Sequence, residues 1–508
     1  MAPRPKKAKR AVVDLVSAHP RQIAGRYEAA QKTTENANLW TLVDSLSAAA
    51  ANSPSVRQIL RDRSRYEYSN SPDVQAVASA YVADYIGDRI GLQLGHDPLS
   101  TIVEGEFAGW MRRGKIMAKL RTMALATYKD GESFAPFITN PNLPHSVKLD
   151  IMPLEAEMIA SFWTGAIALQ RNEVDGIRFD EHRNPTEYRI LRQHPGDYRT
   201  TWKVGKAGGD WTDARYVLHM QNWSKLRPGQ VRGVPETTSI LSIPGLLRQY
   251  IMATITAAKT AAELAGVMQT DLVPEIDGSK TAAELAALAS IDIQRGTLVS
   301  LPEGWSLSQM KAEQPTANFK EFCDFLKSHI GRPSNMPRNV AIGDSSDYNY
   351  ASGRLDHQMW DRCQAVQRDD LSTNILDRLY AAFIEELIPV LRARGTRITK
   401  PEEDRLLAQI PEWYFRRRKH VDPAKEANAD HTRLGDMTQT LGDYWAEQGE
   451  DGGRKTNEWL DERIEIEKTW NLKRTAAGLD PAPLPVVAQS ILQPDEPDEP
   501  AKVKPDET

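Results

Sequence analysis

The sequence predicts an α+β fold, because helical and strand-type patterns occupy separate stretches of the chain. Residues 74–86 repeat apolar side chains at helical spacing, which indicates a helix with one buried face. Residues 174–191 instead alternate apolar and polar side chains around a turn, as a β-hairpin does. From Pro235 onward long helical patterns return. Helices therefore flank a central strand-rich part.

Composition limits the class of protein. With 40% hydrophobic and 26% charged content and a formal net charge of -5, the composition is typical of water-soluble globular proteins. The chain's 508 residues exceed what one hydrophobic core usually serves, so we expect either several domains or one elongated subunit of a larger assembly. Its two cysteines, Cys323 and Cys363, have no CxxC spacing, which suits a reducing cytoplasm and indicates no structural zinc. Lys259 and Glu263 interrupt the most apolar helical stretch, so we expect no membrane span.

The N-terminal elements are predicted in order. Residues 1–20 are basic with little to bury and indicate a mobile arm, most simply a solvated tail. Ser53-Pro54 and Ser71-Pro72 each offer a capping serine and a proline suited to the first helical position, and Gly87 can end the second helix. The helical signal resumes over Thr101–Tyr128, and Phe134–Leu154 is more strand-like.

Strands dominate the middle of the chain. Ile177 and Phe179 alternate with polar residues, and Tyr188 and Ile190 do the same in a second stretch. Because His182–Pro185 between them has the composition of a turn, the pattern predicts a hairpin. Tyr216–Met220 indicates a further strand.

Two helices then flank a small insert. Glu236–Gly266 predicts a long helix rich in alanine, whose small side chain lets neighbouring helices approach closely. The insert is predicted as a strand at Val267–Val273, a helix at Ala282–Ala289 and a strand near Thr297–Leu301. Asn318–Ile330 is helical again.

The C-terminal third is predicted as helical. Ala351–Arg394 indicates a helix of about 40 residues, longer than the typical ~11, which Pro389 should kink or end. Asp422-Pro423 starts a final helical pair over Ala424–Gly449 and Lys455–Trp470. From about Thr475 the chain is acidic and proline-rich, which predicts a flexible tail.

Catalytic motifs are weak. Gly109–Lys115 has P-loop spacing, but Ile116 stands where a magnesium-binding serine or threonine is required, and the segment is predicted as helix without a preceding strand. His357 lies six residues before Cys363, which does not place both on one helical face. Asn222–Ser224 matches a glycosylation sequon that has no meaning in the cytoplasm. We predict no catalytic, cofactor-binding or metal-binding residues and no enzyme activity.

Two polar segments allow two interpretations each. Arg416–His420 follows three aromatic residues and has the composition of a nucleic-acid patch, but a half-buried strand whose arginines form subunit ion pairs is favoured. Gly343–Tyr350 is either a plain connecting loop or a loop that presents Asn, Tyr and Ser side chains to a sliding partner.

Several segments, in this order, resemble the lambda-type portal proteins of tailed bacteriophages, and the resemblance spans roughly residues 21–475. No single segment is decisive, but their order and spread are specific. They are Arg26–Gln31, Ala51–Pro54, Asp175–Glu181 with Asn184-Pro185, His194–Asp197, Val217–His219, Arg227–Pro235, Gly343–Ser346 with Asn349-Tyr350, and Val421–Glu426.

The resemblance implies an elongated subunit, with a wing, a two-helix stem, a small α/β clip and a helical crown, in a closed ring. The implied parts are a flexible basic arm (1–20), the wing (21–235), the first stem helix (236–266), the clip (267–317), the second stem helix (318–332), a tunnel-loop region (333–350), a long wing helix and strand (351–420), crown helices (421–474) and the acidic tail (475–508).

The resemblance also implies a function: a channel, typically of twelve subunits, at the unique capsid vertex, through which double-stranded DNA is packaged and ejected. Its implied partners are the terminase large subunit, the major capsid and scaffold proteins and the head-tail adaptor, in the virion and, during assembly, in the host cytoplasm. The candidate DNA-facing residues are Arg338, Asn339, Ser345, Ser346, Tyr348, Asn349 and Tyr350.

Charge is compatible with that function, because a net negative ring would let duplex DNA slide with little counterion-release affinity. Two alternatives remain. One is a scaffold or shell protein of the capsid, and the other is a packaging enzyme, which the missing P-loop serine or threonine argues against.

Overall fold

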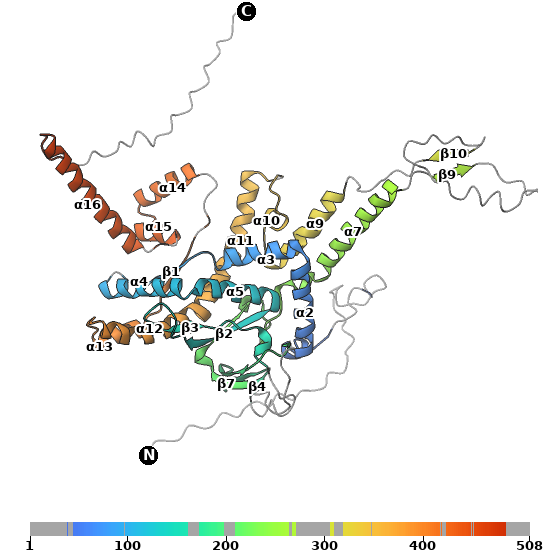
Figure 1. The fold of residues 1–508 in the computed structure, drawn as a ribbon, viewed down its shortest axis with the longest axis horizontal. Coiled ribbons are helices and arrows are strands. Elements are labelled where there is room, and N and C mark those ends of the chain that lie inside the picture. The colour runs from blue at the N-terminus through green and yellow to red at the C-terminus, as the bar shows by residue number, and fades with distance from the viewer. Residues whose placement is uncertain are drawn as a thin grey trace, which may run out of the picture. The chain divides into compact units, whose positions relative to one another are not determined.

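The computed structural model describes residues 38, 44–95, 97–160, 172–197, 209–263, 267–270, 305–308, 318–346, 348–416, 418, 423–448, 450 and 452–483. The chain divides into two units, Met1–Ala51 and Asn52–Thr508. In the first unit the described part holds the short helix α1 (Ala48–Ala51). The predicted arm at 1–20 lies outside the described residues. All other elements belong to the second unit (Figure 1).

Four helices follow one another at the start of the second unit: α2 (Pro54–Asn70), α3 (Pro72–Tyr85), α4 (Pro98–Arg113) and α5 (Ile116–Asp130). Both serine-proline starts are confirmed, and the Ser71 side chain accepts a hydrogen bond from the Val74 amide. The predicted apolar face of α3 is buried. The stretch predicted as one continuous helical signal is two helices, because Lys115 takes the left-handed conformation (φ 53°) between α4 and α5.

Two antiparallel sheets follow. Strand β2 (Glu132–Thr139) pairs with β3 (Leu149–Ile151) on one side and with β8 (Val217–Gln221) on the other. The second sheet has the order β4 (Glu173–Val174), β5 (Ile177–Phe179), β6 (Pro185–Leu191) and β7 (Gly209–Asp213). Ile177 lies opposite Tyr188, so the predicted hairpin and the strand near 216–220 are confirmed.

A helix pair and two short strands come next. Helix α7 (Ser242–Glu263) packs beside α9 (Phe319–Gly331), and strand β9 (Val267–Thr270) pairs with β10 (Trp305–Ser308) (Figure 1). The first helix starts later than predicted, because Glu236–Ile240 forms a 3-10 helix. The helix predicted at 282–289 and the strand predicted near 297–301 lie outside the described residues.

The long predicted helix is a continuous helical run with a change of winding. It consists of α11 (Tyr350–Leu371), a π-helical turn (Ser372–Leu376) and α12 (Asp377–Ala393). The possibility that Pro389 ends it is wrong, because α12 continues for four residues beyond the proline. Helix α13 (Lys400–Ala408) and strand β11 (Glu412–Phe415) follow, and β11 pairs with β1 (Ile90–Gln93) near the start of the chain.

Three helices, not the predicted pair, form the C-terminal part. They are α14 (Pro423–Gly435), α15 (Leu441–Glu447) and α16 (Gly452–Ala476). The predicted first helix breaks after Gly435, where Met437 takes a left-handed conformation. Helix α16 extends two residues into the segment predicted as tail, of which residues 484–508 lie outside the described part.

The main core joins elements that are distant in sequence. Phe383 of α12 lies 5.1 Å, between ring centroids, from both Phe107 and Trp110 of α4. All three side chains are almost fully buried, so the C-terminal part of the long helical run is anchored on the N-terminal helices. Within the described residues, no helix has the length and apolar character that crossing a membrane requires.

Candidate functional site

The candidate channel residues lie between α9 and α11, and only part of the segment is a loop. Arg338 and Asn339 belong to α10 (Arg338–Ile342), a short helix that Gly343 ends in the left-handed conformation (φ 71°). Ser345, Ser346, Tyr348 and Asn349 follow in irregular backbone, and Tyr350 is the first residue of α11. The prediction of a loop before the long helix is therefore right for its second half.

Hydrogen bonds hold this segment in place at both ends. Asp344 accepts hydrogen bonds from the Ser346 amide (2.9 Å) and hydroxyl (2.6 Å) and forms an ion pair with Lys320 of α9 (3.2 Å). These contacts lower the pKa of Asp344 to about 2, so its carboxylate is ionised at neutral pH. At the other end Asn349 caps α11 by accepting a hydrogen bond from the Ser352 amide (2.8 Å).

The structure brings some of the candidate residues together. The Asn339 amide nitrogen lies 3.5 Å from the Ser345 hydroxyl, and Tyr348 donates a hydrogen bond to Asp356 of α11 (3.1 Å). Arg338, Ser345, Ser346 and Asn349 are exposed. Among the described residues, the exposed side chains of the segment are thus one arginine and three neutral polar groups, and the half-buried carboxylate of Asp344 lies among them.

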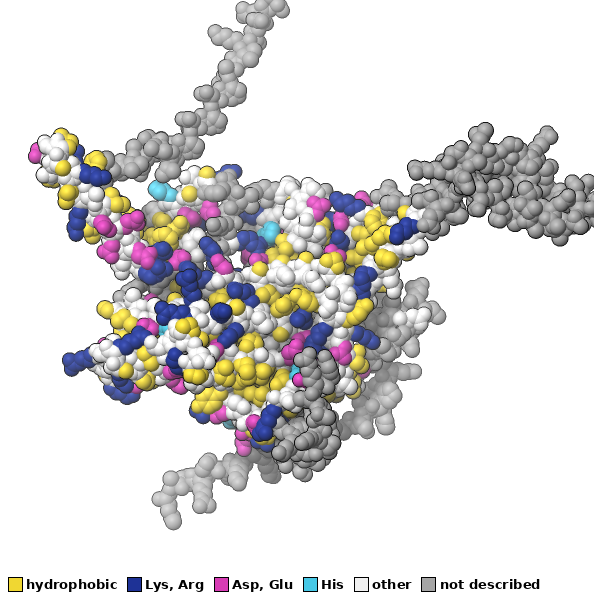
Figure 2. Space-filling view, viewed as in Figure 1, with side chains coloured by type: hydrophobic (Ala, Val, Ile, Leu, Met, Phe, Trp, Pro, Cys, Tyr) yellow, Lys and Arg dark blue, Asp and Glu magenta, His cyan; other side chains and the backbone are white. Residues whose placement is uncertain are grey.

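The helix pair α7 and α9 exposes several large apolar side chains. The two helices pack through Tyr250, whose ring lies 5.5 Å from that of Phe319 and 5.0 Å from that of Phe322. Figure 2 shows hydrophobic side chains at the surface of this pair. The exposed members are Leu246, Met252 and Ile255 on α7 and Phe322 and Phe325 on α9, with exposed fractions of 41–61%. Exposed apolar groups gathered on adjoining helices are typical of an interaction surface.

A buried ionic network holds the strand-rich part together. Glu132, at the start of β2, is fully buried and accepts hydrogen bonds from Arg61 (2.5 Å), Arg232 (2.8 Å) and His219 (3.0 Å). Burial opposes ionisation of Glu132, but these three donors outweigh it and hold the pKa of its carboxyl well below the ordinary value. Nothing in the sequence pattern indicated this network, because its members are up to 171 residues apart in sequence (Arg61 to Arg232).

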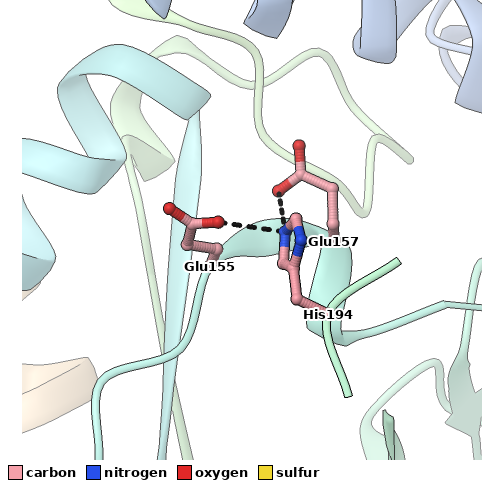
Figure 3. A group of neighbouring side chains, drawn as sticks. All are labelled: Glu155, Glu157 and His194. Atoms are coloured by element: carbon pink, nitrogen blue, oxygen red, sulfur yellow. Dashed lines mark ion pairs between the residues drawn. The ribbon is translucent and has the colours of Figure 1, made fainter. Parts of the chain in front are cut away.

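A smaller charged cluster was also not predicted. His194 Nε2 lies 3.0 Å from a Glu155 oxygen and 3.9 Å from a Glu157 oxygen, as Figure 3 shows. Three such groups have the chemistry of a divalent-metal site. However, the same Glu157 oxygen forms an ion pair with Arg65 (2.9 Å), whose positive charge opposes cation binding. The arrangement fits an ion-pair chain between α2 and the turn at His194.

The other sequence candidates have structural places. Gly109–Lys115 comprises the last turn of α4 and the two residues that connect it to α5, and Trp110 within it is fully buried, so the P-loop match is a packed helix end. The strand before the basic run ends at Phe415, and Arg416 and Arg418 form ion pairs within the chain, with Asp88 (2.7 Å) and Asp84 (2.5 Å). The other residues of that run lie outside the described part.

His357 and Cys363 do not form a shared site. His357 contacts Arg418 and lies 3.5 Å from Asn339, whereas Cys363 is a half-buried free thiol. The second cysteine, Cys323, is a buried free thiol on α9.

Comparisons with known proteins agree on one family. Residues 35–367 match the family described as "Phage portal protein, lambda family". A relative described as "Probable portal protein", from Halomonas phage phiHAP-1, is 22% identical over 372 residues, which cover 70% of this chain and 68% of the relative.

Similar solved structures come from gene transfer agent (GTA) particles. A chain from the neck of a native particle, computed with C12 symmetry, is 12% identical with a TM-score of 0.40, and the match covers 76% of this chain and 91% of that one. A chain from the neck of an empty particle, computed with C6 symmetry, is 13% identical with a TM-score of 0.39 and coverages of 82% and 92%.

Proposed function

The chain belongs to the lambda family of phage portal proteins, and from this premise we propose that copies of it close into a ring-shaped channel at the unique vertex of the capsid. Double-stranded DNA passes through the channel during packaging and ejection. The ring first docks the terminase large subunit and later the head-tail adaptor, and the major capsid and scaffold proteins surround it during assembly. Its role is structural, in the virion. The family match carries this proposal.

The arrangement of elements supports the proposed parts of the subunit. Helices α7 and α9 pack together and flank the strand pair β9–β10, as two stem helices would flank a clip. The sheets and helices α2–α5 correspond to the wing, and the helical run α11–α12 to its long helix. Helices α14–α16 correspond to the crown.

The apolar surface of α7 and α9 supports ring closure. A ring forms when one face of a subunit binds a different face of the next at a fixed rotation. Met252 (61% exposed) and Phe325 (57% exposed) are the most exposed apolar side chains on the two stem helices. Burying such groups against the next copy removes apolar area from water, which favours association by roughly 25 cal/mol per Å².

The loop before α11 supports a weakly gripping channel. The exposed side chains among its described residues are Ser345, Ser346 and Asn349, Arg338 is exposed on the adjoining helix α10, and Asp344 keeps a negative charge beside them. Hydroxyl and amide groups bond to DNA phosphates without releasing counterions, so such a lining steadies the duplex while allowing it to slide.

Negative-stain microscopy and native mass spectrometry of the purified full-length chain test the proposal. We expect flat rings with a central hole, and we expect Met252→Asp and Phe325→Asp to reduce the ring fraction while the circular dichroism spectrum stays unchanged. Ile410→Asp is the matched control, because Ile410 is also exposed (79%) but lies outside the stem. A chain that stays monomeric under all assembly conditions, forms closed shells, or hydrolyses ATP by itself would refute the proposal.

A further inference from the structure

A polar cavity of about 910 Å³ lies between helices α3, α5 and α11 and the residues that follow β11. It gathers side chains from parts of the chain that are up to 335 residues apart (Ala83 to Arg418). Guanidinium groups are its most frequent lining groups. The lining arginines are Arg121, Arg362, Arg368, Arg416 and Arg418.

The cavity has more positive than negative groups. Its lining carboxylates are Asp84, Asp88 and Asp361, so five arginines face three aspartates and two positive charges are left in excess. Two of the arginines form ion pairs with all three aspartates. Arg416 pairs with Asp88, and Arg418 pairs with Asp84 and, at a longer distance of 3.4 Å, with Asp361.

The other three arginines have no carboxylate partner among the described residues. Arg121 donates to the Gly87 carbonyl (3.0 Å), and Arg368 donates to the carbonyls of Asp84 and Tyr85. Arg362 is exposed and forms no ion pair within the described part of the chain. Each guanidinium has five N–H donors, so donors remain free in this cavity.

A buried glutamine gives independent evidence of a ligand. Gln364 lines the cavity and is only 2% exposed, yet within the described structure neither its amide nitrogen nor its amide oxygen has a hydrogen-bond partner. Buried polar groups in folded proteins are nearly always hydrogen-bonded, because leaving them unpaired after removal from water is unfavourable. The cavity lining therefore includes a buried amide without a partner in the described structure and the guanidinium of Arg362, which forms no ion pair within the described part of the chain.

We propose that this cavity is an anion site that binds a phosphate group, with Arg362 as a charged donor and the amide of Gln364 as a neutral donor. Arginine suits phosphate because its planar fork of N–H groups matches two phosphate oxygens. A free phosphate dianion would balance both excess positive charges, and a phosphodiester of the DNA backbone, which is a monoanion, would balance one of them. The phosphate comes either from a free anion or from the backbone of duplex DNA. The site belongs to the single chain and does not depend on ring formation.

Isothermal titration of the full-length chain tests this site, with inorganic phosphate in one arm and a short duplex DNA of arbitrary sequence in the other. We expect saturable binding in at least one arm, and Arg362→Gln should weaken it by about tenfold or more, because a hydrogen bond to a charged group is lost. Gln364→Leu should weaken it too, without lowering the melting temperature in phosphate-free buffer, because leucine removes a buried unpaired amide. Arg192→Gln is the control, since Arg192 is exposed and outside the cavity.

The two arms separate the sources of the phosphate. Binding of inorganic phosphate alone identifies a free anion, whereas DNA binding that inorganic phosphate displaces and that both cavity variants weaken identifies the backbone. The proposal is overturned if neither ligand binds saturably, or if the two cavity variants bind as tightly as Arg192→Gln. Because Arg362 lies at the surface, its variant remains informative even if Gln364→Leu does not fold.

Discussion

Replacing Arg232 tests whether the buried ionic network holds the strand-rich part of the chain together. Arg232 is 3% exposed, and its guanidinium donates to Glu132 Oε1 (2.8 Å) and to three backbone carbonyls. Those carbonyls belong to Ala156 (2.9 Å), Ile159 (3.1 Å) and Asp175 (2.6 Å). Arg232→Met fills much of the same space but removes all four bonds at once.

The loss of stability expected for Arg232→Met is large relative to the total free energy of unfolding. Breaking a buried ion pair by removing one partner costs about 3–5 kcal/mol, because the remaining charge stays buried. Arg61 and His219 still bond to Glu132, which argues for the lower end, but three carbonyls also lose their donor. We therefore expect a loss of about 4 kcal/mol out of the roughly 5–15 kcal/mol that stabilises a typical folded domain.

Urea unfolding followed by tryptophan fluorescence measures this loss, and hydrogen exchange of the β2 and β8 amides locates it. Arg192→Met is the control, because its ion pair with Asp210 is mostly exposed and should contribute little. The double variant Glu132→Gln with Arg232→Met should lose less than the sum of the single variants, since the unpaired charge is gone. An Arg232→Met unfolding curve that overlays the Arg192→Met curve would refute the reasoning.

Three further changes have defined outcomes. Burial lowers the pKa of His219, so below about pH 6.5 the unfolded chain binds more protons than the folded chain does. The urea concentration at the unfolding midpoint should therefore fall as the pH is lowered from about 7.5 to about 5.5. In His219→Gln the midpoint should fall less over the same range. Phe383→Ala should cost about 3–5 kcal/mol in urea unfolding, and a smaller loss in Phe383→Leu would identify lost packing as the cause. Gly131→Ala should lower the melting temperature, because φ is +90° and the new Cβ would lie 2.4 Å from Val234, whereas Gly105→Ala on α4 meets no atom and should not.

The sequence predicted the elements whose signals are local. The buried face of α3 and the hairpin around Ile177 and Tyr188 follow from periodicity alone, and the structure has both. The sequence did not predict helix ends at which a residue takes a backbone conformation that is unusual for its type. Lys115 is left-handed between α4 and α5, and a residue with a Cβ is uncommon there, so no pattern marks the break.

The contacts between charged groups could not be predicted for a different reason. Glu132 lies two residues before the stretch that the sequence marks as strand-like and is in fact the first residue of β2, so in the sequence it resembles an exposed polar residue. Its donors come from α2, from β8 and from the segment after β8, and only the packing of those elements brings them together. Likewise the basic run after β11 has the composition of a nucleic-acid patch, but Arg416 and Arg418 are already engaged by aspartates near the end of α3.

The distribution of paired and unpaired groups bears on how copies of the chain would associate. In the strand-rich part, Arg61 and Arg232 are nearly fully buried and bonded to the buried carboxylate of Glu132. On helices α7 and α9, by contrast, the apolar side chains of Met252 and Phe325 expose more than half of their surface to water. The buried ionic network is thus complete within one copy of the chain, whereas the exposed apolar groups of α7 and α9 offer area for packing against a neighbouring copy. Association through such a surface should weaken little with salt, since screening acts on charges and not on apolar contacts.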